Sequence, residues 1–246
     1  FNITGGAGAD TLAGANGADI ISGGAGVDTI TGNTGADTLT GGAGADNFAF
    51  AATTIRSGIS GSSTASTSAK TDTITDFVAG TDNINLIAGL TSNAQTVTFT
   101  DTGDAASVSA GLALLSGVAG EYFFNTGDSQ LVVDLDGNGL IQATDLIVNM
   151  TDETGFASSD MDVIVAVAAA NHAQTITTGA GNDSIIAGDG IDVLTTGAGN
   201  DYLQGSVATD SADADVLTGG AGDDTYMFVT APSTTSEVVE ASGTDT

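Results

Sequence analysis

The chain has 246 residues, and its hydrophobic content of 41% is enough for two or three small folded units, which argues against a disordered polymer. Arg56 and Lys70 are its only arginine and lysine, against 31 acidic residues, so the formal net charge is −29. Nucleic acid is excluded as a partner because no basic patch is available to contact phosphate groups, and anionic membrane surfaces are unfavourable partners for the same reason. The lack of cysteine excludes disulfides and thiolate metal sites, and without a long apolar run no membrane span is predicted.

The acidic residues are 27 aspartates and only four glutamates. A generic acidic surface has no evident reason to avoid glutamate, whereas short carboxylates held close to the backbone are suited to metal ligation. Two basic side chains cannot neutralise so many carboxylates within the chain. We therefore expect metal cations to be the partners.

Residues 5–49 form five consecutive copies of a nine-residue repeat: GGAGADTLA, GANGADIIS, GGAGVDTIT, GNTGADTLT and GGAGADNFA. Each copy has glycine at its first and fourth places, aspartate at its sixth and an apolar residue at its eighth. The glycines allow sharp backbone turns, and the residues after the aspartate are typical of a short strand. The pattern predicts a parallel β-roll in which two copies complete one coil.

The roll brings like charges together, because residues eighteen apart stack and place Asp10 over Asp28 and Asp19 over Asp37, about one strand spacing (~4.8 Å) apart. Such columns repel unless a cation lies between them. Calcium takes six to eight oxygen ligands, which turn carbonyls and carboxylates can supply. We therefore expect several calcium ions and a folding reaction coupled to their binding. The alternative is a glycine-rich solenoid without metal.

The region after the first block has a different character. A Ser/Thr/Gly-rich stretch covers 57–71, strand-like runs separated by turn residues cover 71–86 and 129–150, and one short helix is expected near 105–116. This region is expected to be a separately folded, β-rich insert.

Within the insert, DLDGNGLIQATD fits an EF-hand calcium loop, except that its twelfth place holds aspartate instead of glutamate. The ligands expected there are Asp134, Asp136, Asn138, the carbonyl of Leu140, and Asp145. Because the flanking sequences look like strands, a β-hairpin with DGNG as its turn is the alternative.

The nine-residue period returns at 178–204 and, after a longer copy at 205–218, ends with GGAGDDTYM at 219–227. Thr178, Ala187 and Thr196 replace the first glycine in this second block, which is therefore expected to be less regular. Asp210 and Asp213 lie in the longer copy, where a bulging loop and an irregular metal site are both open.

The fold expected from these patterns is mostly all-β, with two parallel β-roll blocks flanking a β-rich insert that has one short helix. The boundaries expected are a roll at 1–50, the insert at 51–170, a second roll at 171–230, and a linker or the start of a further segment at 231–246.

The repeat GGxGxDxUx, where U is apolar, resembles the nonapeptide of the RTX (repeats-in-toxin, haemolysin-type calcium-binding) family. The resemblance implies calcium sites made of aspartate side chains and glycine carbonyls. The matching aspartates are Asp10, Asp19, Asp28, Asp37, Asp46, Asp183, Asp192, Asp201, Asp215 and Asp224. The matching turn glycines are Gly5, Gly8, Gly14, Gly17, Gly23, Gly26, Gly32, Gly35, Gly41, Gly44, Gly181, Gly190, Gly199, Gly219 and Gly222.

The insert is similar to the serralysin-type C-terminal domain through DTITDFVAGTDNINL, which follows NFAF. In that family the domain caps the roll and helps to present a type I secretion signal, but here a second repeat block follows. Catalysis is not expected. The serralysin proteases carry HExxH in a separate domain, whereas the single histidine, His172, lies in AANHAQT, and no nucleophile elbow is present.

Two functions follow from these expectations. The first is a secreted, calcium-dependent component of a bacterial surface layer or extracellular matrix, whose partners would be calcium and copies of itself or other surface components. The second is an export and stability module of a type I-secreted enzyme or toxin whose active domain lies outside these residues.

Overall fold

The computed structural model describes residues 1–52, 71–90, 96–116, 119–135, 139–140, 145–167, 173–188, 190–205, 214–228 and 237–246. Strands dominate these residues. The helices among them are the five-residue α1 (Val108–Leu112) and one 3-10 turn, Ser158–Asp160. The expectation of a mostly all-β fold with one short helix is therefore confirmed.

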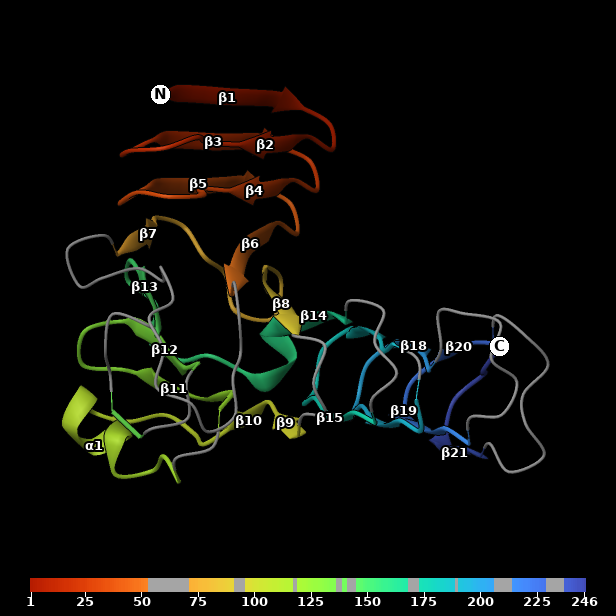
Figure 1. Ribbon diagram of the computed structural model, residues 1–246. Helices are drawn as coiled ribbons and strands as arrows, with labels where there is room; N and C mark the ends of the chain where they lie inside the picture. The colour runs from red at the N-terminus through yellow and green to blue at the C-terminus, as the bar shows by residue number, and fades with distance from the viewer. Residues whose placement is uncertain are drawn as a thin grey trace.

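The first block is a parallel β-roll, visible as the stack at the top of Figure 1. Its strands are β1 (Asn2–Ala7), β2 (Thr11–Ala13), β3 (Ile20–Ala25), β4 (Thr29–Thr31), β5 (Thr38–Ala43) and β6 (Asn47–Ala52). Odd-numbered strands form one sheet and even-numbered strands the other, with partners such as Thr11 and Thr29 eighteen residues apart. Two repeats therefore make one coil, as the period predicts.

The eighth place of each repeat builds the interior of the roll. Ile21, Ile30, Leu39 and Phe48 are fully buried, and Leu12 packs against them at the open end. Side chains alternate across a strand, so the residues on either side of this place face outward. Three-residue strands suffice because each buries one apolar side chain against the facing sheet.

The insert continues both sheets of the first block. Strand β7 (Asp72–Ile74) pairs with β5, and β8 (Asn83–Leu90) pairs with β6, both in parallel. Beyond β7 the sheet adds β13 (Leu146–Met150), β12 (Gln130–Asp134), β11 (Glu121–Asn125) and β10 (Thr100–Asp101). Helix α1 packs so closely on β11 that a Cβ at Gly111 would collide with the ring of Phe123.

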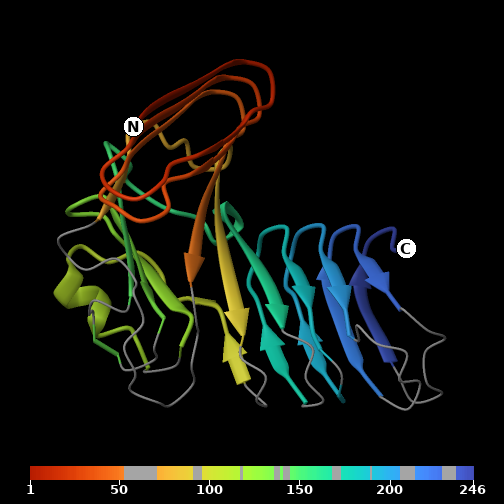
Figure 2. The same ribbon diagram turned by 45° about the horizontal axis from the view of Figure 1, so that its top comes forward.

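The second block shares a sheet with the first. Strand β14 (Met161–Val167) pairs with β8 and is followed by β16 (Ser184–Ile186), β18 (Tyr202–Gln204) and β20 (Thr225–Met227), so one eight-stranded parallel sheet crosses the whole molecule. The opposite sheet contains β9 (Thr96–Thr98), β15 (Thr175–Thr177), β17 (Val193–Thr195), β19 (Val216–Ala221) and β21 (Glu237–Ser242). Figures 1 and 2 show that the two blocks stack in different directions. The expected domain boundaries remain a prediction.

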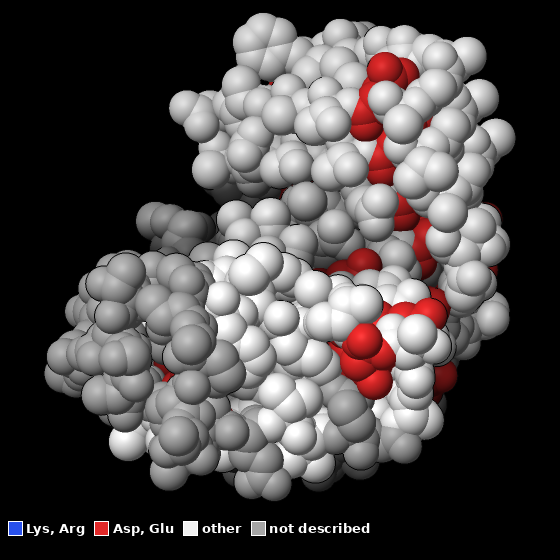
Figure 3. Space-filling view, turned by 90° about the vertical axis from the view of Figure 1, so that its right-hand side faces the viewer, with Lys and Arg blue, Asp and Glu red and all other residues white. Residues whose placement is uncertain are grey.

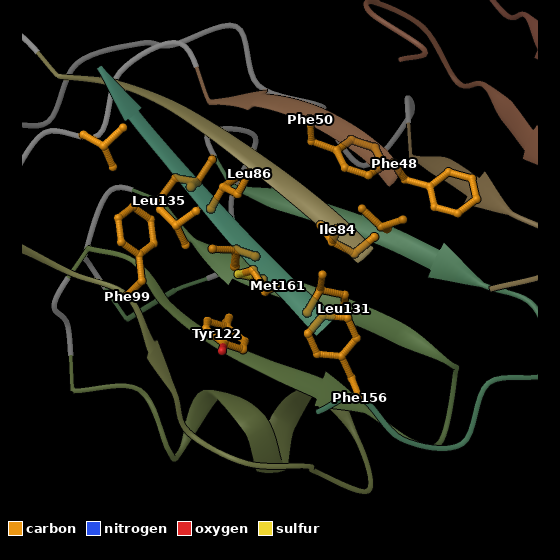
Figure 4. Packing of buried hydrophobic residues seen from close by; sticks show 14 of the residues in the cluster. Phe48, Phe50, Ile84, Leu86, Phe99, Tyr122, Leu131, Leu135, Phe156 and Met161 are labelled. Atoms are coloured by element: carbon orange, nitrogen blue, oxygen red, sulfur yellow. The ribbon is translucent and has the colours of Figure 1, made fainter. Parts of the chain in front are cut away.

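An aromatic cluster lies where the first block meets the insert, and Figure 4 shows Phe48, Tyr122 and Phe156 in the surrounding core. Phe77 stacks on Phe156 with ring centroids 5.9 Å apart, and the ring of Phe48 lies 6.3 Å from that of Phe77. Tyr122 meets Phe156 edge to face. Such contacts add about 0.5–1.5 kcal/mol per pair to the effect of burial. One continuous hydrophobic core therefore connects the first block, the insert and the second block.

Residues 237–246 form a further turn of the roll. Strand β21 pairs in parallel with β19, and the N–H of Asp224 donates to Asp245 Oδ1. The sequence assigned this segment to a linker or to the start of a further segment. The nine-residue pattern is obscured there because only Gly243 and Asp245 keep the fourth and sixth places of the repeat.

Candidate metal centre

The repeat aspartates form ladders along the roll. In each, Oδ1 accepts a hydrogen bond from the backbone N–H of the equivalent aspartate one coil earlier. The N–H of Asp10 donates to Asp28 at 2.8 Å, and the N–H of Asp28 donates to Asp46 at 2.9 Å. On the opposite side the N–H of Asp19 donates to Asp37 at 2.8 Å. The stacking expected from the period is therefore present.

The ladders continue into the insert through two aspartates outside the regular period. The N–H of Asp37 donates to Asp72 Oδ1 at 2.8 Å, and the N–H of Asp46 donates to Asp82 Oδ1 at 2.9 Å. Both lie beyond the five consecutive copies, because they follow their partners by 35 and 36 residues instead of the 18 residues that separate successive coils of the first block. Their signal is the triplet of aspartate, any residue and isoleucine, which matches the sixth to eighth places of the repeat.

The second block has equivalent ladders. The N–H of Asp183 donates to Asp201 at 2.8 Å and that of Asp201 to Asp224 at 2.9 Å, while across the roll the N–H of Asp192 donates to Asp215 at 3.0 Å. The longer copy at 205–218 therefore returns to register at Asp215. Asp210 and Asp213 lie outside the described residues.

The second carboxylate oxygen of several ladder residues is buried and has no hydrogen-bond partner. These oxygens belong to Asp28, Asp37, Asp46, Asp183, Asp201 and Asp224. A buried, unpaired carboxylate costs several kcal/mol unless a cation or a proton compensates it. Arg56 and Lys70, the chain's only arginine and lysine, lie outside the described residues. A cation from solution is therefore the natural partner.

Glycine at the first place of the repeat creates a small cradle, which we define as the space in front of its Cα where a carboxylate oxygen and a carbonyl oxygen converge. A Cβ at Gly14 would lie 2.5 Å from Asp19 Oδ2 and 2.5 Å from Gly32 O. The same pairing of oxygens occurs at Gly5 and Gly23. Cβ positions at Gly32, Gly41, Gly205 and Gly219 likewise meet the carboxylate of their own repeat. Any side chain at these places would fill the cradle.

The cradles offer hard oxygen donors from both backbone and side chain, which is the ligand set that calcium prefers. Among the residues the structure describes, no group of three or more His, Asp or Glu side chains is placed to hold a metal by side chains alone. A metal held by these residues would therefore need backbone carbonyls among its ligands. The donor set fits calcium and does not suit zinc, which favours imidazole and thiolate ligands.

The fourth-place glycines are required by backbone geometry. Gly26 and Gly44 have φ of 140° and 144°, a region that side chains rarely adopt. A Cβ on Gly44 would also collide with the backbone of Gly26 in the neighbouring coil. At the second place, Asn33 replaces glycine with φ 69°, and its Nδ2 donates to Gly14 O at 2.8 Å. Asparagine tolerates this conformation better than most residues.

Burial raises the pKa of five carboxyls in the ladders. It raises the pKa of Asp37, Asp46 and Asp201, and it brings Asp72 to about 6 and Asp183 to about 7. Backbone N–H groups that donate to these carboxylates oppose the effect, while neighbouring aspartates add to it. Without a cation, these carboxyls therefore keep their protons to a higher pH than an exposed aspartate does. A bound divalent ion would favour their ionised form.

The EF-hand-like segment is partly described. Strands β12 and β13 pair antiparallel, and Asp134 and Asp145 are fully buried where the strands leave the sheet. Asp145 Oδ1 accepts from the N–H of Leu135 at 3.1 Å, and Asp134 Oδ2 from the N–H of Gly139 at 2.8 Å. Asp136 and Asn138 lie outside the described residues, so calcium binding by this loop stays a prediction.

Acidic side chains follow one another in a line down one face of the first block (Figure 3). The parallel β-roll has glycine turns, aspartate ladders and oxygen-lined cradles. This combination indicates a repeat protein of the cation-binding class.

The comparison with protein families specifies this class. The model of the RTX calcium-binding nonapeptide repeat matches four times, over 2–30, 22–51, 177–211 and 207–228. Both blocks are therefore RTX repeats, as the resemblance implied. No curated protein matches the chain.

RTX repeats are a structural, calcium-binding type and not a catalytic family. His172 lies outside the described residues. In the described part of the chain, no helix has the length and apolarity needed to cross a bilayer.

Proposed function

We propose that this chain is a calcium-dependent structural segment of a bacterial surface layer or extracellular matrix. RTX repeats imply a calcium-binding structural segment of a secreted protein, and the surface-layer role is the finer part of the proposal. The expected site residues, the ten repeat aspartates and their turn glycines, are part of this proposal.

The observation that carries the proposal is the set of buried, unpartnered carboxylate oxygens in the ladders. At Gly23, the unpartnered Asp28 Oδ2 shares a cradle with the backbone carbonyl of Gly41 from the next coil. The roll keeps both kinds of oxygen away from water, so each empty cradle destabilises the folded state. Calcium bound in the cradles would remove this cost and link one coil to the next.

The proposed mechanism couples folding to the site of action. At low cytoplasmic calcium, repulsion within the aspartate columns favours an extended chain that can be exported. Outside the cell, millimolar calcium exceeds the dissociation constants of about 10⁻⁴–10⁻³ M that are typical of extracellular modules. Binding then stabilises the roll by mass action, and the rigid coils become a structural unit.

Far-UV circular dichroism of the full chain tests the proposal. We expect strand content to increase as calcium is added to the EGTA-treated protein and to fall again on chelation. Magnesium at the same concentration is the control, because its smaller, octahedral shell suits carbonyl-rich sites poorly. Strand content that does not change on chelation would contradict the coupling of folding to calcium.

The second candidate is a stability and export module of a type I-secreted enzyme or toxin. It is favoured by the continuous sheet in which β6 of the roll pairs with β8 and β8 with β14. A roll ordered by calcium would provide an edge on which an attached domain could fold. Light scattering separates the candidates. Calcium-dependent assembly into sheets or fibres supports the surface-layer role, whereas a monomer at millimolar calcium supports the module.

A further inference from the structure

The two blocks differ at the first place of the repeat. The first block has glycine in every copy: Gly5, Gly14, Gly23, Gly32 and Gly41. The second block begins three consecutive copies with Thr178, Ala187 and Thr196 and returns to glycine only at Gly205. All three side chains are buried. The second block therefore has side-chain atoms where the first block has cradles.

The position matters because the cradle is small. A Cβ on Gly23 would collide with Asp28 Oδ2 and would lie 2.6 Å from Gly41 O. The φ angle of Gly23 lies outside the left-handed region, so its own backbone conformation does not require glycine. Its role is to keep the space in front of the carboxylate and the carbonyl open.

Thr196 shows what occurs when this space is filled. Its hydroxyl donates to Gly219 O at 2.6 Å, and the side chain is 4% exposed. Gly219 begins the copy in the next coil, so its carbonyl corresponds to that of Gly41 opposite Gly23. The carbonyl is therefore already bonded to a donor from its own chain.

The threonine hydroxyls also face the aspartates of their own copies. Burial raises the pKa of Asp201 and of Asp183, and the neighbouring side chains of Thr196 and Thr178 partly oppose that rise. Thr178 is 5% exposed, and its hydroxyl makes no hydrogen bond of regular geometry. Both hydroxyls thus lie on the side of the turn where a first-block cradle is open.

We propose that Thr178 and Thr196 take the place of calcium in the inner turns of the second block. The inference rests on the proposed function, in which glycine cradles bind calcium, and it removes Asp183 and Asp201 from the proposed calcium ligands. The first block is then switched by calcium, whereas the coils around β16 and β18 fold without it. Calcium would have to break the hydrogen bond from Thr196 to Gly219 O and displace the side chain.

The number of bound calcium ions tests this inference in the full chain, by native mass spectrometry and equilibrium dialysis. Thr196→Gly opens a cradle and is expected to bind one ion more than the unmodified protein. Thr196→Ser keeps the hydroxyl and is the matched control, with an unchanged number of ions. Gly23→Thr closes a cradle in the first block and is expected to bind one ion fewer.

A smaller number of ions in Thr196→Gly would show that the threonine is a ligand, whereas an equal number would show that its side chain does not block a site. Either result would overturn the inference. If the unmodified protein binds no calcium, the proposed function itself fails, which is a distinct result. Hydrogen exchange in EGTA provides a test without variants. We expect β3 and β5 to lose protection while β16 and β18 keep theirs, and equal loss in both blocks would contradict the inference.

Discussion

The first and second blocks have the same coil, the same ladders and the same buried apolar place, yet they differ in what completes their turns. In the first block, the carboxylate of Asp28 faces an open cradle at Gly23. In the second, the carbonyl of Gly219 already accepts a hydrogen bond from Thr196. One backbone geometry thus suits two kinds of partner: an external ion at an open cradle, or a side-chain hydroxyl that donates to the carbonyl.

The largest effects are expected from a matched pair of core substitutions, Leu39→Ala in the first block and Leu194→Ala in the second. Both leucines are fully buried at the eighth place, and each loss should cost about 2–5 kcal/mol. Leu39→Ala should raise the calcium concentration at the folding midpoint. Leu194→Ala should destabilise the second block equally in calcium and in EGTA. Denaturant unfolding in both conditions measures the difference, and a similar calcium dependence in the two variants would contradict the comparison.

A smaller loss is expected from Gly44→Ala. At φ 144° a side chain is strained and meets the backbone of Gly26, so we expect a cost of about 1–3 kcal/mol. Gly6→Ala is the control, because no atom lies near a Cβ there. Thermal unfolding in saturating calcium should separate the two variants. Equal melting temperatures would show that close approach of the fourth-place glycines does not stabilise the roll.

The calcium-free protein should become less stable as pH rises. The folded-state pKa of Asp72 is about 6 and that of Asp183 about 7, both above the ordinary value of 3.8. The folded state therefore retains protons that the unfolded state has released, so the free energy of unfolding is highest below about pH 4 and falls towards pH 7. In calcium the trend should reverse, because protons compete with the ion. Urea titrations from pH 4 to 8 in EGTA check the first trend, and a rising stability would contradict it.

The smallest effect is expected at Tyr226. Its hydroxyl is buried without a hydrogen-bond partner, and both it and Asp224 Oδ2 lie close to the position of a Cβ on Gly219. Tyr226→Phe should therefore change stability by less than about 1 kcal/mol. It should, however, reduce tyrosine-sensitised luminescence of terbium bound in place of calcium. Tyr202→Phe is the control, since that hydroxyl bonds to Gln204. Unchanged emission from Tyr226→Phe would argue against an ion in the Gly219 cradle.

The regular parts of the molecule could be predicted from the sequence because their geometry repeats. A period of nine fixes the stacking of Asp10 on Asp28 and the burial of Ile30 beside Leu39. The continuation through Asp72, Asp82 and Asp245 was not predicted, since insertions make these coils longer than 18 residues without breaking the ladder. Nor could the sequence show that the sheet of the first block passes through β8 and β14 into the second.

The significance of Thr196 also required three dimensions. In the sequence it is a departure from the glycine pattern, and it gains a chemical meaning only because the carbonyl of Gly219 lies 2.6 Å from its hydroxyl.

Anomalous diffraction from crystals grown in calcium tests the central claim most directly, because it locates each ion. We predict peaks in the first-block cradles beside Asp19, Asp28 and Asp37, and no peak at Thr196. Diffraction that shows ordered aspartate ladders but no calcium beside these three residues would contradict the account.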